Sequence, residues 1–177
     1  MKDKLLDIEN QLLVMEAQDG DAQAMEKLVC RWQKKLWHYI FRLTSDRAAT
    51  WDITQQCWLE VIKGLKKLND PACFKAWTYR IATNESIDWL KKKSKDRQIN
   101  LDSTEAGCDQ KKDNLEINEL IQRLKSDSRV VLSLYYFEKL SIFEISIALN
   151  IPQGTVKSRL FKARDELKQL WEKYFDN

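Results

Sequence analysis

Residues 155–164 carry side chains that could bond nucleic acid on one face of a predicted helix. The apolar positions of this helix recur at helical spacing and should face a core: Val156, Leu160, Ala163 and Leu167. The outward positions are mostly cations and small hydroxyls: Thr155, Lys157, Ser158, Arg159, Phe161, Lys162 and Arg164. Cations neutralise phosphates or bond guanine, and hydroxyls bond bases or phosphates at close approach. No acid lies between Asn150 and Arg164.

A second short helix is predicted just before this one. Ser141 and Glu144 have capping-box spacing, so a helix should begin at about residue 142 and bury Ile142, Ile145 and Leu149. Pro152 and Gly154 interrupt the pattern before the cationic helix begins. This order is typical of a helix-turn-helix, whose second helix lies in the DNA major groove. The alternative is a surface helical hairpin whose charges are only solvated.

The composition favours an all-α fold. The 177 residues include four Gly and two Pro, 32% are charged, and no long run alternates strictly. The net charge of +3 is too small to identify a ligand by itself. Residues 1–95 contain 17 Lys and Arg against 13 Asp and Glu, residues 96–115 contain 3 against 5, and residues 116–177 contain 10 against 9.

Residues 96–115 lose the apolar periodicity and are polar, with Gly and Ser. This pattern predicts a flexible linker between two small helical domains, residues 1–95 and 116–177. Twenty such residues span roughly 25 Å, enough for the two domains to hold separated sites. The second domain's core should include the apolar positions before the helix pair: Ile117, Ile121, Leu124, Val130, Val131, Leu134 and Phe137.

The start of the chain is an amphipathic run with acids, not a secretory signal, and no stretch approaches the ~20 apolar residues of a membrane span. We therefore expect a cytoplasmic protein without membrane insertion. The cysteines are widely spaced and His38 is the only histidine, which favours reduced packing cysteines over a metal site or disulfides. We expect no metal, cofactor or catalytic constellation. The cysteines are Cys30, Cys57, Cys73 and Cys108.

The first domain should begin with helices over residues 5–18 and from Asp21, a plausible N-cap. The second of these has a core stripe: Met25, Leu28, Val29, Trp32, Leu36, Ile40 and Leu43. Trp37, Tyr39 and Phe41 lie beside this stripe and need a second apolar surface, either within the chain or from a partner.

A third helix is predicted over residues 48–68. Its buried face should be Ile53, Cys57, Val61, Ile62, Leu65 and Leu68. Another face carries carboxylates and amides: Asp52, Gln55, Gln56 and Glu60. This surface is poorly suited to phosphate and suggests contact with protein, although an ordinary solvated face fits the spacing equally well.

Residues 74–97 follow the turn signal Asn69-Asp70-Pro71 and mix aromatic and cationic side chains. Tyr79 and Trp89, with polar Asn84, Ser86 and Asp88, interleave with cations: Lys75, Arg80, Lys91, Lys92, Lys93, Lys95 and Arg97. Aromatic rings between cations suit single-stranded nucleic acid, because each stacked base contributes roughly 1–3 kcal/mol. The alternative is that Trp77 and Trp89 are core residues and the lysines only complement a helix C-terminus.

Three stretches together resemble one family, the small sigma factors of the extracytoplasmic-function group, which direct bacterial RNA polymerase to promoters. The first is Asp52-Ile53-Thr54-Gln55-Gln56 with Trp58, and the second runs from Phe74 through Trp77, Tyr79-Arg80-Ile81-Ala82 and Asn84 to Asp88. The third runs from Ile151-Pro152 through Gly154-Thr155-Val156-Lys157-Ser158-Arg159-Leu160 to Ala163-Arg164. They occur in the family's order and spacing, and the resemblance spans residues 21 to the C-terminal helix.

The resemblance implies that the first domain is similar to sigma region 2 and the second to region 4. Core RNA polymerase would be bound through the β′ clamp helices and the β flap, with Asp52, Gln55, Gln56 and Glu60 on the clamp contact. The loop at residues 69–73 and the following helix would bind the minus-ten element and capture a flipped nontemplate base. The minus-ten residues would be Trp77, Arg80, Asn84, Asp88 and Lys91.

The helix-turn-helix would bind the minus-thirty-five element through Thr155, Lys157, Ser158, Arg159, Phe161 and Lys162. Gln56 stands where the family commonly has an acid, and Lys157 and Lys162 stand where Arg is frequent. Lys lacks the planar fork that pairs with guanine in two bonds.

The resemblance also implies an anti-sigma factor that covers the polymerase and DNA faces, and no bond-making catalysis in this chain. Two other classes remain open on the residues alone. One is a DNA-binding regulator that acts without polymerase, and the other is a helical protein-interaction module. A true DNA binder would show a salt slope near −0.9 per phosphate contacted.

Overall fold

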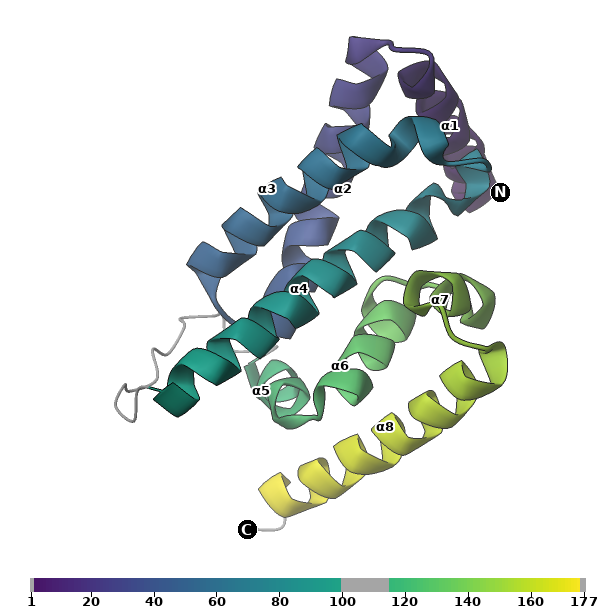
Figure 1. The fold of residues 1–177 in the computed structure, drawn as a ribbon. Helices are drawn as coiled ribbons and strands as arrows, with labels where there is room; N and C mark the ends of the chain where they lie inside the picture. Colours follow the sequence, from purple (N-terminus) through teal and green to yellow (C-terminus); the bar gives the residue numbers. More distant parts are fainter. Residues whose placement is uncertain (1, 100–114, 176–177) are drawn as a thin grey trace.

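The described part of the chain is built from helices. The computed structural model describes residues 2–99 and 115–175, and within these ranges it contains no strand. The first group comprises α1 (Lys2–Gln18), α2 (Ala22–Thr44), α3 (Arg47–Gly64), the 3-10 turns η1 (Leu65–Lys67) and η2 (Pro71–Cys73), and α4 (Phe74–Ile99). The second comprises α5 (Leu115–Arg123), α6 (Ser126–Leu132), the π-helical turn η4 (Ser133–Phe137), α7 (Ile142–Leu149) and α8 (Gln153–Phe175) (Figure 1). The predicted all-α class is confirmed, and none of the described helices is both long and apolar enough to cross a bilayer.

Helix ends follow the capping signals in the sequence. Asp21 caps α2 by accepting from the backbone N–H of Gln23 at 2.8 Å, and Gly20 before it has a φ of 101°. The Ser141 side chain accepts from the Glu144 N–H at 3.2 Å, and the Glu144 carboxylate accepts from the Ser141 N–H at 2.7 Å. Each cap satisfies backbone donors that the first helical turn leaves free, which fixes where the helix begins.

The helices on either side of the predicted linker limit its extent. α4 continues to Ile99, beyond residue 96 where the linker was expected to begin, and α5 starts at Leu115. The remainder of the predicted linker, with Cys108, lies outside the described residues. The proposed division into residues 1–95, 96–115 and 116–177 therefore stays a prediction.

Most of the predicted apolar stripes are buried. Leu28, Leu36 and Ile40 of α2 are completely inaccessible, and so are Val61 of α3 and Val156 of α8. Two predictions were wrong. The side chain of Ile62 is 51% exposed because it lies on the outward side of α3, and Phe137 is 38% exposed, with its ring under the Arg42 guanidinium at 4.4 Å.

The aromatic residues beside the α2 stripe find their second apolar surface within the chain. Tyr39 is buried edge-on against Tyr79 at 5.1 Å between ring centroids, and its hydroxyl lies 2.6 Å from the Thr83 hydroxyl. Trp37 stacks on Phe41 with 5.2 Å between centroids. Trp37 also lies 5.8 Å from the ring of Trp51, at the start of α3.

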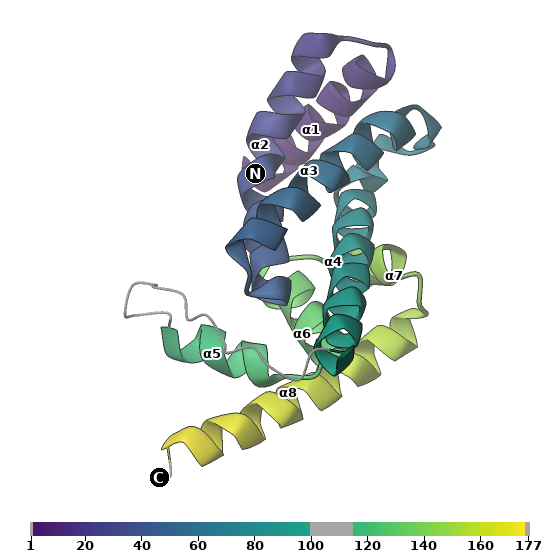
Figure 2. The same ribbon diagram turned by 60° about the vertical axis from the view of Figure 1, so that its left-hand side comes forward.

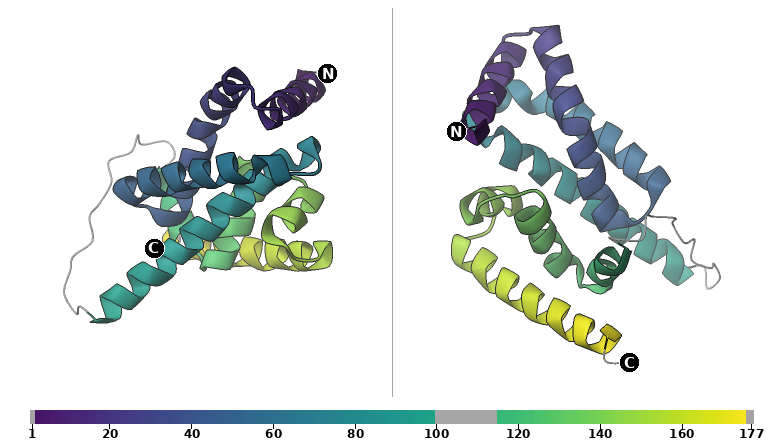
Figure 3. Two further views of the ribbon diagram at one scale, coloured as in Figure 1. Left: turned by 45° about the horizontal axis from the view of Figure 1, so that its top comes forward. Right: turned by 180° about the vertical axis from the view of Figure 1, so that it is seen from behind.

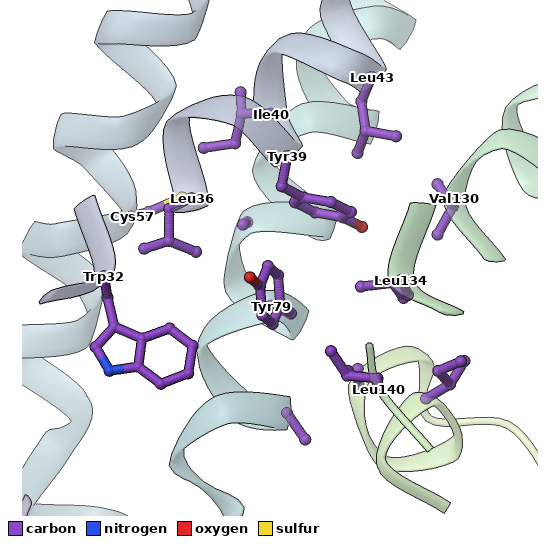
Figure 4. Close-up of a cluster of buried hydrophobic side chains, with 14 of the residues drawn as sticks. Trp32, Leu36, Tyr39, Ile40, Leu43, Cys57, Tyr79, Val130, Leu134 and Leu140 are labelled. Carbon is purple, nitrogen blue, oxygen red and sulfur yellow. The ribbon is translucent and has the colours of Figure 1, made fainter. Parts of the chain in front are cut away.

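The two groups of helices pack against each other along α4. Figure 2 shows α4 between the N-terminal helices and α7, and it contacts both. Their buried side chains form a single cluster, in which Leu43 and Tyr79 from the first group face Val130 and Leu134 from the second (Figure 4). The sequence pattern predicted two separate cores but not this shared one.

Polar contacts cross the same interface. The Glu138 carboxylate, with only 6% of its side chain exposed, accepts hydrogen bonds from Arg42 and from the Tyr79 hydroxyl. Burial and the nearby Glu138 raise the pKa of Tyr79, so its hydroxyl stays protonated and donates.

The C-terminal end of α2 is also capped from the second group. Arg129 donates to the Leu43 carbonyl at 2.8 Å, and Gln122 donates to the Arg42 carbonyl at 2.7 Å. These carbonyls lack partners within α2, so the second group supplies bonds that the helix end needs.

Candidate binding surfaces

The outward face of α8 is cationic and accessible. Lys157, Ser158 and Lys162 are exposed, and Phe161 is 72% exposed. Val156, Leu160 and Ala163 on the opposite side are buried, so packing determines which side of the helix faces outward. Four of the six predicted minus-thirty-five residues therefore share one free surface.

The remaining two residues of that set are less accessible. Thr155 is half-buried at the start of α8, and its carbonyl accepts from the Ser158 hydroxyl at 3.0 Å. Arg159 lies at the edge of the face, where its guanidinium is 3.4 Å from the Asp127 carboxylate. Arg159 would have to leave this pair in order to bond a base or phosphate.

The turn before α8 holds that helix against α7. Asn150 ends α7 in the left-handed region with a φ of 52°, and its N–H donates to the Ile147 carbonyl at 3.3 Å. The buried Ile145 and Ala148 of α7 belong to the same cluster as Val156. The predicted helix-turn-helix is therefore present, with its second helix projecting a free face.

One side of α4 carries the predicted minus-ten residues. Their spacing of three or four residues aligns them along the helix: Trp77, Arg80, Asn84, Asp88 and Lys91. Arg80, Asn84, Asp88 and Lys91 are exposed, and Trp77 is half-buried. Lys91 pairs with Asp88 at 3.4 Å, an exposed pair that DNA could displace at little cost.

A hollow of about 420 Å³ lies at the N-terminal end of this row, next to Trp77. Its lining comes from the end of α3, the following loop and α4: Gly64, Lys67, Leu68, Asn69, Asp70, Cys73 and Trp77. Asp70 shapes the loop by accepting from the Ala72 N–H at 2.9 Å. The hollow is large enough to admit a planar, partly apolar group of the size of a nucleobase.

Gly64 allows Trp77 to form the wall of the hollow. A Cβ atom at position 64 would lie 2.9 Å from Cζ2 of the indole, closer than such atoms approach. The aromatic wall therefore rests directly on the backbone at the end of α3.

The aromatic residues of α4 do not all serve a stacking role. Tyr79 is 1% exposed and its hydroxyl is bonded to Glu138, so the interpretation of Tyr79 as a base-stacking residue was wrong. Ser86 is also buried. Trp89 is half-buried with Lys93 at 4.5 Å from its ring, and Trp77 is the aromatic side chain beside the hollow.

The polar face of α3 is exposed as predicted. Asp52, Gln55 and Gln56 are exposed, and Glu60 is partly covered by Lys63 at 3.2 Å. Three apolar residues on and beside this face are exposed, which the sequence pattern did not predict. They are Trp51, Leu59 and Ile62, at 48%, 50% and 51% exposure. The pattern assigned Ile62 to the buried face and the other two to neither the buried nor the polar face.

A contiguous group of exposed apolar side chains rimmed by polar residues is a mark of an interaction site. The α3 face, defined as Asp52, Gln55, Gln56, Leu59 and Glu60 with Trp51 and Ile62 at its edges, therefore fits a protein partner. The spacing of the polar residues alone fitted a protein-binding face and an ordinary solvated face equally well.

Comparison with known proteins identifies the family. Residues 28–96 match the family model of sigma-70 region 2, and residues 114–167 match that of sigma-70 region 4, so the two matches together span more than half of the chain. The chain belongs to the sigma-70 family of transcription initiation factors.

Curated relatives narrow this assignment. The chain is 29% identical to the ECF RNA polymerase sigma-E factor of Escherichia coli over 94% of this chain and 95% of that protein. It is 28% identical to the ECF RNA polymerase sigma factor SigW of Bacillus subtilis, over 88% and 93%, and to the RNA polymerase sigma-H factor of Pseudomonas aeruginosa, over 90% and 92%. The protein is a sigma factor of the extracytoplasmic-function group.

Solved structures share the fold. The chain superposes with a TM-score of 0.73 on CnrH in complex with the cytosolic domain of CnrY, at 20% identity over 93% of this chain and 97% of that one. The sigma factor RpoE of Bartonella quintana, in complex with the anti-sigma factor NepR, gives a TM-score of 0.73 at 18% identity over 83% and 96%.

Proposed function

We propose that the chain guides core RNA polymerase to promoters through three separate surfaces. The α3 face binds the polymerase, the exposed side of α4 with its hollow binds the minus-ten element, and the outward face of α8 binds the minus-thirty-five element. The observation that carries this proposal is the presence, in one chain of the sigma-70 family, of all three surfaces in accessible positions. Such a protein works in the bacterial cytoplasm, where polymerase meets DNA.

The hollow at Trp77 would hold an extruded nontemplate base. Extruding a base costs a few kcal/mol of pairing and stacking, and contacts with an aromatic wall and polar loop offset that cost. The exposed Arg80 and Lys91 would follow the phosphates, and Asn84 would bond the separated strand. The protein would therefore use binding energy to trap melted DNA, while the polymerase carries out the bond-making chemistry.

Promoter binding would require the two groups of helices to separate. The minus-ten and minus-thirty-five elements lie about 25 base pairs apart, roughly 85 Å along the duplex at 3.4 Å per pair. In the structure Arg80 of α4 lines a hollow with Ser146, Asn150 and Ile151 of the helix-turn-helix, and α4 contacts α7, so the two proposed DNA-binding elements lie against each other. The packed form would therefore be the state of the chain before it binds a promoter.

An anti-sigma factor is the expected regulator. Structural neighbours of this chain were solved with the cytosolic domain of CnrY and with the anti-sigma factor NepR. An inhibitor of this chain would bind the α3 face or hold the packed form, since either action blocks assembly with polymerase on a promoter.

The test combines a core polymerase pull-down with promoter-dependent transcription. Wild-type chain should bind core enzyme saturably and produce discrete start sites. Lys157→Ala with Lys162→Ala should weaken promoter binding and spare core binding, and Lys168→Ala is the matched control because it lies further along α8 and pairs with Glu172 at 3.7 Å. Asn84→Ala should spare core binding and reduce opening, which permanganate reactivity of unpaired thymines measures.

Two results would contradict the proposal. Retention of duplex DNA without any core binding would indicate a regulator that acts without polymerase. Loss of core binding in Asn84→Ala would mean that α4 contacts the enzyme instead of the melted strand.

A further inference from the structure

Helix α1 has two apolar sides, and folding accounts for only one of them. Leu13, Val14 and Ala17 are buried against the rest of the first group. A surface helix of a globular protein normally carries one such stripe. On the other side of α1, four apolar side chains are more than half exposed: Leu5 at 62%, Ile8 at 55%, Leu12 at 53% and Met15 at 51%.

These four residues, here called the outer α1 stripe, form one continuous row. They are separated by three, four and three residues, the spacing of the a and d positions of a coiled coil. On a helix this spacing aligns them on a single side, opposite the buried one. Figure 3 shows α1 at the edge of the molecule, and its contacts are with α2, η1 and η2 on the inner side.

The charge around the outer α1 stripe is acidic. Between Leu5 and Asp19 the sequence contains no Lys or Arg and four acids: Asp7, Glu9, Glu16 and Asp19. Glu9 and Glu16 each follow a d position, so they occupy the e positions that flank a coiled-coil seam. Glu16 is exposed, and Glu9 keeps 60% of its side chain exposed although it pairs with Arg31 at 2.9 Å.

We propose that the outer α1 stripe binds an amphipathic helix of another protein, one with a leucine-rich or isoleucine-rich seam flanked by Lys or Arg. Apolar side chains would fill the seam, and the partner's cations would pair with Glu9 and Glu16. This surface is additional to the three of the proposed function and does not rest on them.

The charges beside the outer α1 stripe favour a cationic helix over a second copy of the chain or an anionic membrane. A second copy of the chain in a parallel pair would place Lys4 opposite Glu9 but only Gln11 opposite Glu16, and an antiparallel pair would place glutamates opposite each other, so neither arrangement neutralises both acids. An anionic membrane surface would repel them. A cationic helix satisfies both the apolar row and its acidic border.

The probe is a labelled three-heptad peptide with Leu at a and d and Lys at e and g, whose lysines repel one another and keep it monomeric. Fluorescence anisotropy with the full chain should show saturable binding. Ile8→Gln with Leu12→Gln should weaken that binding at least tenfold. Phe143→Gln, which changes a similarly exposed apolar side chain on α7 outside the three proposed binding surfaces, should leave it unchanged.

A second peptide with Glu in place of Lys isolates the charge. It should bind wild-type chain at least tenfold more weakly, and Glu16→Lys should reduce that preference while leaving the apolar row intact. Circular dichroism should show the same helicity in every variant, because the substituted side chains are exposed.

Three results would overturn the proposal. The first is no saturable binding of the Lys peptide at concentrations up to about 1 mM, or a loss of binding in Phe143→Gln equal to the loss in the α1 variant. The second is equal affinity for the Lys and Glu peptides. The third is self-association of the chain in sedimentation that Ile8→Gln with Leu12→Gln abolishes, since that would assign the stripe to a second copy.

Discussion

Replacing Glu138 with Ala should open the packed form of the protein. In the structure this carboxylate accepts from Arg42 and Tyr79, both on the other group of helices, and 6% of its side chain is exposed. Removing one partner of a buried ion pair typically costs 3–5 kcal/mol, because the other charge is left without compensation. Arg42 is 18% exposed and keeps its contact with Phe137, so we expect about 3 kcal/mol, at the lower end of that range.

This cost applies only to the packed form, since water solvates Arg42 and Tyr79 once the groups separate. A difference of about 3 kcal/mol shifts the equilibrium between packed and open forms by more than a hundredfold, at 1.36 kcal/mol for each factor of ten. Small-angle scattering is the direct assay. A compact chain of this length has a radius of gyration of about 16 Å, and Glu138→Ala should exceed the wild-type value clearly.

The matched control is Glu172→Ala, which removes the same side chain from an exposed pair with Lys168 on α8. That variant should scatter like the wild type, because an exposed pair contributes little. Equal helicity in circular dichroism would exclude unfolding as the cause of expansion in Glu138→Ala. A scattering curve of Glu138→Ala that matches the wild type would refute the argument that this carboxylate holds the two groups together.

Three further predictions concern local structure. Ser141→Ala removes the capping box of α7 and should lower the free energy of unfolding by about 1 kcal/mol in urea titrations. Gly64→Ala places a Cβ 2.9 Å from Trp77, so it should shift indole fluorescence and lower the melting temperature, and an unchanged spectrum would contradict the close approach. The Ala49 N–H and Lys93 hold the pKa of Asp46 below its ordinary value of 3.8, so ionised Asp46 stabilises the fold above that pH and the contribution is lost as the pH falls through the lowered folded pKa. Acid should therefore destabilise wild type more than Asp46→Asn, whose amide still caps α3, and equal losses of stability in parallel acid titrations would contradict this role of the Asp46 carboxylate.

The sequence was most informative where a local signal fixes the structure. The capping box at Ser141 and the cap at Asp21 set helix starts to within a residue, because each satisfies backbone donors nearby. The outward face of α8 was likewise readable, since its buried residues follow helical spacing.

The interface between the two groups could not be read in the same way. Glu138 looks like any surface glutamate in the sequence, and Tyr79 looks like an aromatic among cations. Their burial depends on contacts between residues 59 positions apart, which periodicity does not encode. Glu138 follows Phe137 at the end of a helical segment. Nothing in the neighbouring sequence indicates that its partners are Arg42 and Tyr79.

Exposed apolar residues posed the opposite difficulty. Periodicity placed Ile62 in the core because it assumes that an apolar side chain is buried. The angular position around the helix separates Ile62 from Val61, since adjacent residues on a helix point about 100° apart. The same angle distinguishes the exposed Leu12 from the buried Leu13 on α1.

The contact between Gly64 and Trp77 determines how rigid the hollow is in the free protein. An indole that rests on backbone has little freedom to change rotamer, so the wall of the hollow is already ordered in the free protein. On the proposed function, the entropy of fixing that wall would be lost once, when the chain folds, and would not reduce the affinity for a captured base. The hollow is in this sense preorganised, and discrimination between bases would fall to the loop of Asn69 and Asp70 that lines its other side.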